Sequence, residues 1–291
     1  MPKVPEAVRT FAPEQWGTVD YFCTFYSTTF NFNATEKRAA SGVSAHFNKA
    51  QYLIVLADKL KPNLELDAIE LEQQGYSPIH NSYELGTVVE AAILELYSVI
   101  DCTVKVIRAV HGKPTRGFKD STRGLFERIE TIVGTIPEEI RNEIKHAHWF
   151  ERLRRIRDEI THLTPGSCHL DSDTNTVTYM HAGIIEHGKS LIINDIFNWV
   201  REMMISINKF IGIVFHYLSR SFNDTPVFQL CGMVQGRALH RYLRPTAGKV
   251  TFDSGECGAW VWFEKEEFPS CPFVEHCGAY KYKAPPQGWE T

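Results

Sequence analysis

The chain has 291 residues, of which 43% are hydrophobic and 23% are charged, and this composition excludes a wholly disordered protein because enough apolar surface is present to form a core. No run of 18 apolar residues occurs, so the sequence predicts no membrane-spanning helix. The first 16 residues carry proline and charge where a secretory signal would be apolar. We expect a cytoplasmic protein with no membrane partner.

Charge is unevenly distributed along the chain. The whole chain carries −4 at pH 7, whereas residues 105 to 157 contain 13 Lys and Arg but 7 Asp and Glu. A local basic segment on an acidic protein is typical of an anion site, with phosphate as the first candidate, although a solvated helix face gives the same pattern. The seven cysteines are scattered and odd in number, so disulfides are not the framework of the fold.

The N-terminal third of the chain predicts two helices after an irregular start. Residues 1 to 33 mix apolar and small polar side chains, which favours a strand or an extended arm. From Thr35 to Leu60, apolar side chains recur at steps of three and four and predict an amphipathic helix. A second helix is expected to begin at a cap on Asn81 or Ser82 and to end at His111-Gly112. Its apolar face contains Val89, Ile93, Leu96, Ile100, Val104 and Ile107.

Further helices and a hairpin are predicted in the middle of the chain. A basic loop from Gly112 to Gly124 leads to a short helical stretch between Leu125 and Val133, and Pro137 suits the first turn of the next helix. The apolar face of another helix consists of Trp149, Leu153, Ile156, Ile160 and Leu163. This helix must end near His162, because the residue before Pro165 avoids the helical conformation. Residues 168 to 183 predict a β-hairpin, and a long helix follows with an apolar face from Ile192 to Leu218.

Beyond residue 224 the pattern changes, since short apolar runs such as Ala259–Phe263 alternate with Gly and Pro. The sequence therefore predicts a mainly α protein with an N-terminal arm (1–33), an up-and-down helical bundle (34–224) and a small β-rich C-terminal appendage (225–291). The β-hairpin is an insertion in the bundle. The aromatic residues of the appendage form either a sheet core or a surface for stacking bases; they are Trp260, Trp262, Phe263, Phe268 and Phe273.

Two short segments contain an Arg and a His with four residues between them. Arg157, Asp158 and His162 lie at the end of the strongest amphipathic pattern, whereas Arg141 and His146 lie close to a helix start at Pro137. Because such pairs also arise by chance, only the context gives them weight. Several helices with the downstream pair late in the third long one resemble the HEPN superfamily of helical-bundle proteins. The resemblance covers about residues 35 to 221.

The resemblance implies a metal-independent endoribonuclease that works as a homodimer, with Arg157 and His162 as catalytic residues and Asp158 beside them. Arg141 and His146 are the second choice. RNA is then the expected partner, and the products carry a 2′,3′-cyclic phosphate and a 5′-hydroxyl. A toxin or defence role, with an antitoxin protein as a further partner, belongs to the same hypothesis. The alternative is a non-catalytic HEPN-like module that dimerises or binds a nucleotide or a protein.

The chemistry of these residue types suits phosphate. His transfers protons near pH 7, Arg presents a fork that matches phosphate oxygens, and Asp158 lies one turn before His162 and could accept a hydrogen bond from its ring. Five residues at 100° each nevertheless place Arg157 and His162 about 140° apart on a straight helix. Either the helix unwinds at His162, or two copies face each other across a dimer axis. Exposure of both residues in a basic cleft would favour the enzyme, and burial of either in an internal ion pair would favour the binding module.

Four cysteines near the C-terminus are candidate zinc ligands: Cys231, Cys257, Cys271 and Cys277. Three of them precede Gly and one precedes Pro, and such turns help thiolates to approach a metal. His276 is a further candidate ligand. Because no Cys-x-x-Cys pair is present, buried or free thiols are the other interpretation, and no other cofactor is expected. The chain also lacks the Gly-rich phosphate loop, the Gly-x-Ser-x-Gly elbow and the His-Glu-x-x-His pattern. The common signatures of nucleotide hydrolases, serine hydrolases and zincin metalloproteases are therefore absent from the sequence.

Overall fold

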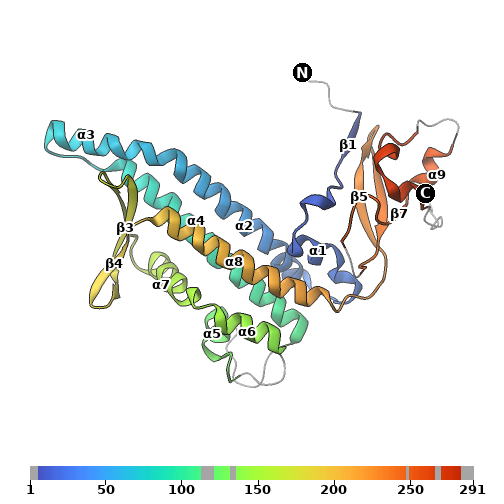
Figure 1. Ribbon diagram of the computed structural model, residues 1–291, viewed down its shortest axis with the longest axis horizontal. Coiled ribbons are helices and arrows are strands. Elements are labelled where there is room, and N and C mark those ends of the chain that lie inside the picture. Colours follow the sequence, from blue (N-terminus) through green and yellow to red (C-terminus); the bar gives the residue numbers. More distant parts are fainter. Residues whose placement is uncertain (1–5, 113–120, 132–135, 247–248, 266–269, 283–291) are drawn as a thin grey trace. The chain divides into compact units, whose positions relative to one another are not determined.

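The computed structural model describes residues 6–112, 121–131, 136–246, 249–265 and 270–282. Its helices are α1 (Thr18–Phe25), α2 (Ala34–Leu60), α3 (Leu64–Gln74), α4 (His80–His111), α5 (Thr122–Arg128), α6 (Glu138–His146), α7 (Trp149–His162), α8 (Ile196–Ser219) and α9 (Trp260–Phe263). Its strands are β1 (Ala7–Arg9), β2 (Ser167–Asp171), β3 (Thr176–Glu186), β4 (Lys189–Ile193), β5 (Val227–Val234), β6 (Arg237–Leu243) and β7 (Glu256–Cys257). The prediction of a mainly α protein is confirmed (Figure 1). None of the helices in the described ranges is long and apolar enough to cross a lipid bilayer.

The chain divides into two compact units. One, the helical unit, is the continuous segment 33–217. The other, the sheet unit, combines residues 1–32 with residues 218–291. The sheet unit is therefore built from the two ends of the chain, a long-range association that hydrophobic periodicity does not indicate.

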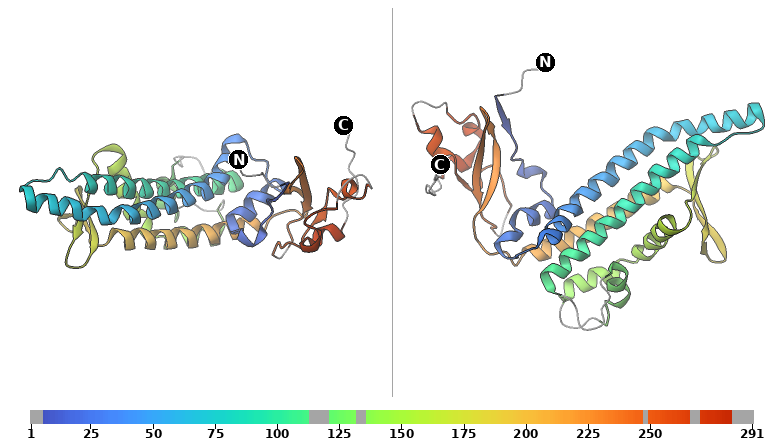
Figure 2. Two further views of the ribbon diagram at one scale, coloured as in Figure 1. Left: turned by 90° about the horizontal axis from the view of Figure 1, so that it is seen from above. Right: turned by 180° about the vertical axis from the view of Figure 1, so that it is seen from behind.

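The helical unit is arranged around the long helices α2, α4 and α8, which lie alongside one another in all three views (Figures 1 and 2). Helix α2 begins where its sequence predicts. The Asn33 side chain accepts hydrogen bonds from the amides of Thr35 and Glu36, and the Glu36 carboxylate accepts one from the Asn33 amide. This reciprocal capping satisfies amides that the first helical turn leaves without partners.

Helix α4 has the predicted apolar face but not the predicted cap. All six predicted core residues of the helix are buried, and the helix ends at His111, where Gly112 adopts a φ of 77°. At the other end, Asn81 and Ser82 do not cap the helix. Their amides donate to the buried carboxylate of Asp67, which belongs to α3. The prediction failed because a side chain from a different helix supplies the cap.

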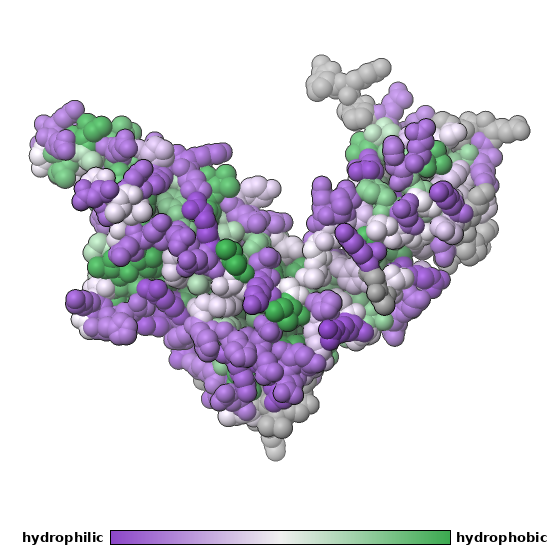
Figure 3. All heavy atoms as spheres, in the orientation of Figure 1, coloured by the Kyte–Doolittle hydropathy of each residue, from purple (hydrophilic) through white to green (hydrophobic). Residues whose placement is uncertain are grey.

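The segments between the long helices follow the predictions in part. Helix α5 occupies the first half of the predicted stretch from Leu125, whereas Val133 and most of the basic loop 112–124 lie outside the described residues. Pro137 directly precedes α6, in agreement with its position at a helix start. Helix α3 was not predicted, and it carries exposed Leu66, Ile69 and Leu71, within the exposed apolar surface visible in Figure 3.

The inserted hairpin is present and has a third strand. Strands β2 and β3 pair antiparallel around residues 172–175, and β4 adds to the other side of β3. The predicted start of the long helix at Ile192 is wrong, because Ile192 lies in β4 and is half exposed. Helix α8 starts at Ile196, after a short loop. The prediction failed because an apolar residue of strand β4 was counted as part of the apolar face of the helix.

The hairpin is attached to α4 through one buried carboxylate. Glu90 Oε1 accepts a hydrogen bond from the Gly166 amide at 2.6 Å and another from the Tyr179 hydroxyl at 2.8 Å. A Cβ at position 166 would collide with the Tyr179 ring, so only glycine allows this approach. His181 contributes a further contact, since its Nε2 lies 2.8 Å from the Thr164 carbonyl oxygen. These contacts fix the segment that follows α7.

The sheet unit contains a four-stranded antiparallel sheet in the order β1-β5-β6-β7. Residues Ala7–Arg9 pair with Gly232–Val234. The N-terminal segment was expected to be a strand or an extended arm. This expectation is wrong for Thr18–Phe25, which folds as helix α1 and buries Val19, Phe22 and Phe25 on one face. Asp20 and the Gly17 amide form its N-terminal cap at 3.2 Å.

The C-terminal part is less β-rich than expected. The run Ala259–Phe263 contributes the short helix α9 rather than a strand. Phe263 is buried with Val234 and Leu239, while Trp262 and Phe273 pack partly buried against the same cluster. This supports a core role for the aromatic residues, and Phe268 lies outside the described residues.

Candidate functional site

Helix α7 carries the predicted Arg–His pair and stays helical through His162. Phe150, Leu153 and Ile156 are buried against the bundle. After His162 the Leu163 amide still donates to the Glu159 carbonyl at 2.9 Å, and the helix ends before Pro165 as predicted. Of the two arrangements that could bring Arg157 and His162 together, unwinding of the helix is therefore absent. A site shared between two copies is the arrangement left for that hypothesis.

The Arg157 guanidinium is held by groups of its own chain. It pairs with Asp158 at 2.8 Å and with Asp101 of α4 at 3.9 Å, and it stacks over the Tyr97 ring at 3.7 Å. Only 22% of its side chain is exposed. A phosphate that bound Arg157 would have to compete with both carboxylates, because the charge of the guanidinium is already largely neutralised within the fold.

Asp158 and His162 do not interact as the motif predicts. Asp158 accepts hydrogen bonds from Arg154 at 2.5 Å and from Arg157 at 2.8 Å, so its two oxygens are occupied by arginines. His162 is exposed, and no described residue lies within hydrogen-bond distance of its ring. Three carboxylates, those of Glu151, Asp158 and Asp101, surround the two guanidiniums, which makes this cluster a poor anion site.

The second-choice pair lies on α6. Arg141 is half-buried, and its Nε finds no hydrogen-bond partner among the described residues. His146 is exposed at the last position of the helix. The same five-residue spacing places these two side chains about 140° apart on a helix, so this copy does not form a compact site within one chain either.

A different set of basic side chains surrounds an open hollow of about 520 Å³ at the start of α7. Its basic lining consists of Arg152 and Arg155 from α7, His148 directly before that helix, and His187 from the β3–β4 turn. The side chains of Arg152 and Arg155 are 39% and 38% exposed. Figure 3 shows predominantly hydrophilic side chains over the part of the unit that contains α6 and α7. A volume of this size is typical of small-ligand sites.

Glu186 orients both arginines of the hollow. Its carboxylate accepts hydrogen bonds from Arg152 at 3.2 Å and 3.0 Å and lies 4.0 Å from Arg155. Arg155 also donates to the Ile185 carbonyl at 2.9 Å. The second acidic residue of the hollow, Glu151, is neutralised by Arg154 at 2.6 Å. The lining therefore carries two guanidiniums and two carboxylates, and each carboxylate is engaged by an arginine.

The β3–β4 turn presents its histidine in an uncommon conformation. His187 has a φ of 51° and Gly188 a φ of 76°, the pair of left-handed values that a tight two-residue hairpin turn requires. Such values are rare for a non-glycine residue and are often found at functional sites. The turn places His187 beside Arg152 and Arg155 at the rim of the hollow.

Part of the hollow was visible in the sequence. His148, Arg152 and Arg155 follow one another at steps of four and three, the spacing of one helix face. His162 is the seventh residue after Arg155, so these two side chains lie within about 20° of each other around the helix axis. The motif had directed attention to Arg157, on a different face. His187 and Glu186 carried no local signal, because only the hairpin brings them to α7.

The four candidate zinc ligands Cys231, Cys257, Cys271 and Cys277 lie in the sheet unit, as free thiols that are buried or half-buried. Within the described ranges, no three Cys, His, Asp or Glu side chains already surround a common point as metal ligands would. Comparison of the chain with protein-family models, with curated proteins and with solved structures gives no match. The HEPN resemblance therefore rests on the order of the helices and the motif.

Proposed function

We propose that the helical unit is a HEPN-like, non-catalytic module that binds the phosphates of a nucleotide or of single-stranded RNA in the hollow beside α7. One contrast carries the proposal. Arg157 is engaged by Asp158, Asp101 and Tyr97, whereas the side chains of Arg152 and Arg155 are 39% and 38% exposed on an open surface. By the criterion of exposure, an internal ion pair at Arg157 favours binding without chemistry.

Arg152 and Arg155 suit this role because each guanidinium can offer a fork of donors to phosphate oxygens. Glu186 holds both side chains in place, which reduces the entropy lost on binding. Binding is therefore expected to weaken as the salt concentration rises.

The test uses a labelled single-stranded RNA, the full chain and EDTA, with binding followed by fluorescence anisotropy. Arg155→Ala should weaken binding and lower the salt dependence by about one released counterion. Arg123→Ala is the matched control, since it removes an exposed side chain of the same charge from α5. Equal affinity of the wild type, Arg155→Ala and Arg123→Ala would exclude the hollow as the phosphate site.

A second candidate function is the metal-independent endoribonuclease, which the exposure of His162 favours. His162 lies on the same helix face as Arg155, two turns or about 10 Å further along. In this case α7 lies at a homodimer interface, and sedimentation should report about twice 33.3 kDa. An antitoxin partner and a cytoplasmic location belong to this second candidate.

The same RNA samples, run on a gel, separate the two functions. The nuclease predicts cleavage in EDTA to a 2′,3′-cyclic phosphate and a 5′-hydroxyl, and a loss of about 10² to 10⁴-fold in His162→Ala, because positioned proton transfer contributes that factor. His146→Ala is the matched control. Intact RNA at saturating protein supports the binding module, whereas cleavage by both His162→Ala and Arg157→Ala would exclude the motif as the catalytic site.

A further inference from the structure

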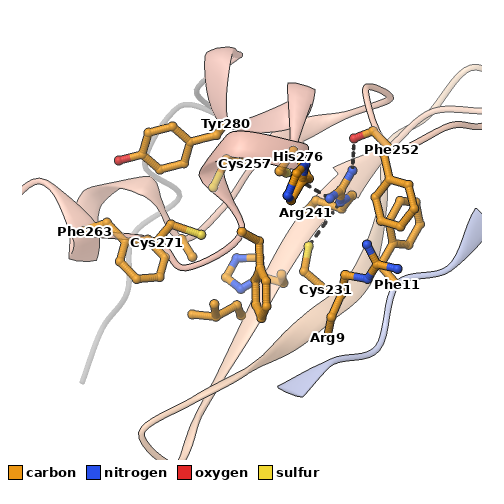
Figure 4. A pocket seen from close by; sticks show the side chains of 15 residues that line it. Arg9, Phe11, Cys231, Arg241, Phe252, Cys257, Phe263, Cys271, His276 and Tyr280 are labelled. Carbon is orange, nitrogen blue, oxygen red and sulfur yellow. Dashed lines mark hydrogen bonds between the residues drawn. The ribbon is translucent and has the colours of Figure 1, made fainter. Parts of the chain in front are cut away.

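A cavity of about 50 Å³ lies inside the sheet unit and is lined by all four candidate zinc ligands (Figure 4). The cysteines come from separate segments: Cys231 from β5, Cys257 from the end of β7, and Cys271 and Cys277 from either side of a short turn at Val274–His276. Residues far apart in the sequence thus gather around one small space. This convergence is independent of the Cys-Gly and Cys-Pro dipeptides that first suggested a metal.

The backbone places Cys231 at the cavity by a β-bulge. Leu230 pairs with His240 and Gly232 with Leu239, so Cys231 is the extra residue of β5. Bulges of this kind redirect a side chain. A Cβ on the next residue, Gly232, would collide with the Val8 carbonyl oxygen of β1. The Cys-Gly dipeptide therefore has two roles: Gly232 allows β1 to pair closely with β5, and the Cys231 thiol lines the cavity.

A buried arginine contacts two of the thiols. Arg241 is 3% exposed; its Nε donates to Cys231 Sγ at 3.1 Å and its Nη2 to Cys277 Sγ at 3.0 Å. Its Nη1 donates to the carbonyls of Phe252 and Ser254. No described carboxylate lies within ion-pair distance of this guanidinium. A buried cation requires a compensating charge, and thiolates in the cavity would supply it.

The other two sulfurs face backbone donors. The Ala259 amide forms a hydrogen bond to Cys257, and the Phe273 amide forms one to Cys271. Each donor lies two residues after its cysteine. All four sulfurs thus receive an N–H donor from the surrounding structure.

The size of the cavity decides what it can hold. Pockets for organic cofactors measure about 300 to 1,000 Å³, far more than this cavity offers. Free phosphate is also a poor fit, because the guanidinium of Arg241 already makes four hydrogen bonds within the protein. A single thiophilic metal ion meets both conditions.

We propose that this cavity binds one Zn²⁺ through Cys231, Cys257, Cys271 and Cys277. The thiols line the walls of the cavity, so binding draws the four sulfurs inward to the tetrahedral distance of about 2.3 Å. Each thiol loses its proton to solvent as its Zn–S bond forms, and zinc stays in the same oxidation state. Four thiolates and Zn²⁺ carry −2, of which Arg241 compensates one charge. The ion would join β5, β7 and the C-terminal segment.

The experiment uses the full chain, purified under reducing conditions without chelator. Elemental analysis should find about one zinc per chain, before or after incubation with zinc chloride. A thiol reagent should modify four fewer of the seven cysteines in the zinc-loaded protein than after removal of zinc by a strong chelator. Cys277→Ser should lower zinc affinity at least tenfold, whereas Cys23→Ser, a cysteine of the same unit that does not line the cavity, should not.

Less than about a tenth of an equivalent of zinc in both preparations would overturn the proposal, as would equal zinc affinity of Cys277→Ser and the wild type. If Cys277→Ser does not fold, the thiol-reagent experiment on the wild-type protein tests the proposal by itself. Equal modification of the zinc-loaded and zinc-free protein would then overturn it. The outcome of the zinc experiment is independent of the outcome of the RNA experiment, because the hollow beside α7 lies in the helical unit and the cysteine cavity lies in the sheet unit.

Discussion

Glu90 and Asp67 are buried carboxyl groups whose surroundings shift the pKa in opposite directions. Burial raises the pKa of Glu90, and the hydrogen bonds from Gly166 and Tyr179 and the nearby His181 offset this only in part. For Asp67, burial acts in the same sense, but the hydrogen bonds from Asn81 and Ser82 outweigh it and lower the pKa. The first group therefore favours the folded state at low pH and the second at high pH.

For Glu90, the contribution to stability is complete below the ordinary carboxyl pKa and is lost as the pH rises through the raised value in the folded state. Glu90→Gln keeps an oxygen that can accept from Gly166 and Tyr179 but cannot ionise. We expect the variant to lose less unfolding free energy than the wild type between pH 5 and pH 8, as measured by urea denaturation.

Glu72→Gln, an exposed change on α3, is the control for the Glu90 prediction and should follow the wild type. If Glu90→Gln shows the same fall in stability as the wild type over this range, ionisation of Glu90 is not what opposes folding at the junction of α4 and the hairpin.

At the scale of elements, Asp67 in the first turn of α3 ties that helix to the start of α4. Its oxygens accept from the amides of Asn81 and Ser82 and also from their side chains, at 2.7 Å and 2.9 Å. Asp67→Ala leaves these donors of the first turn of α4 without partners. Loss of a helix cap costs about 0.5 to 2 kcal/mol, so thermal unfolding should occur at a lower temperature.

Hydrogen exchange resolves the same effect along the chain. The amides of residues 81 and 82 should exchange faster in Asp67→Ala, while the amides in the middle of α4 keep their protection. Glu65→Ala, an exposed change two residues before Asp67, is the control. Unchanged exchange at residues 81 and 82 would contradict the role of Asp67 as the cap.

The outcome for individual elements shows what sequence periodicity can predict. The faces of α2 and α4 were correct, because each is amphipathic over several turns and buries one continuous stripe. For α7 the face was correct only in part: Leu153 and Ile156 are buried, whereas Leu163 lies beyond the helix and is 71% exposed. Helix α1 was missed because Thr, Ser and aromatic side chains are common in both strands and irregular segments. The cap on Asp67 and the hollow beside α7 were missed for one reason: each depends on a residue that the fold brings from another element.

At the scale of the whole molecule, the sheet unit depends on both ends of the chain. Phe11 is 1% exposed and packs against Trp16, Phe252 and the Arg241 guanidinium. Phe11→Ala should destabilise the sheet unit by about 3 to 5 kcal/mol, the usual cost of emptying a large aromatic site. Limited proteolysis should then cut within residues 218–291 much faster, while residues 33–217 stay resistant.

Val8→Ala is the control for Phe11→Ala, since Val8 is 41% exposed in the same N-terminal segment. Equal acceleration of cleavage in residues 33–217 and in residues 218–291 would show that the two units do not unfold separately.

The pairing of β1 with β5 also has a consequence during protein synthesis. Ala7–Arg9 are synthesised about 220 residues before their partners Gly232–Val234, an interval of roughly 11 to 44 s at about 5 to 20 residues per second. Residues 33–217 form a continuous unit, and every one of their internal partners is present once Tyr217 has been made. The nascent chain thus carries a complete helical unit while its first strand still has only water to bond with.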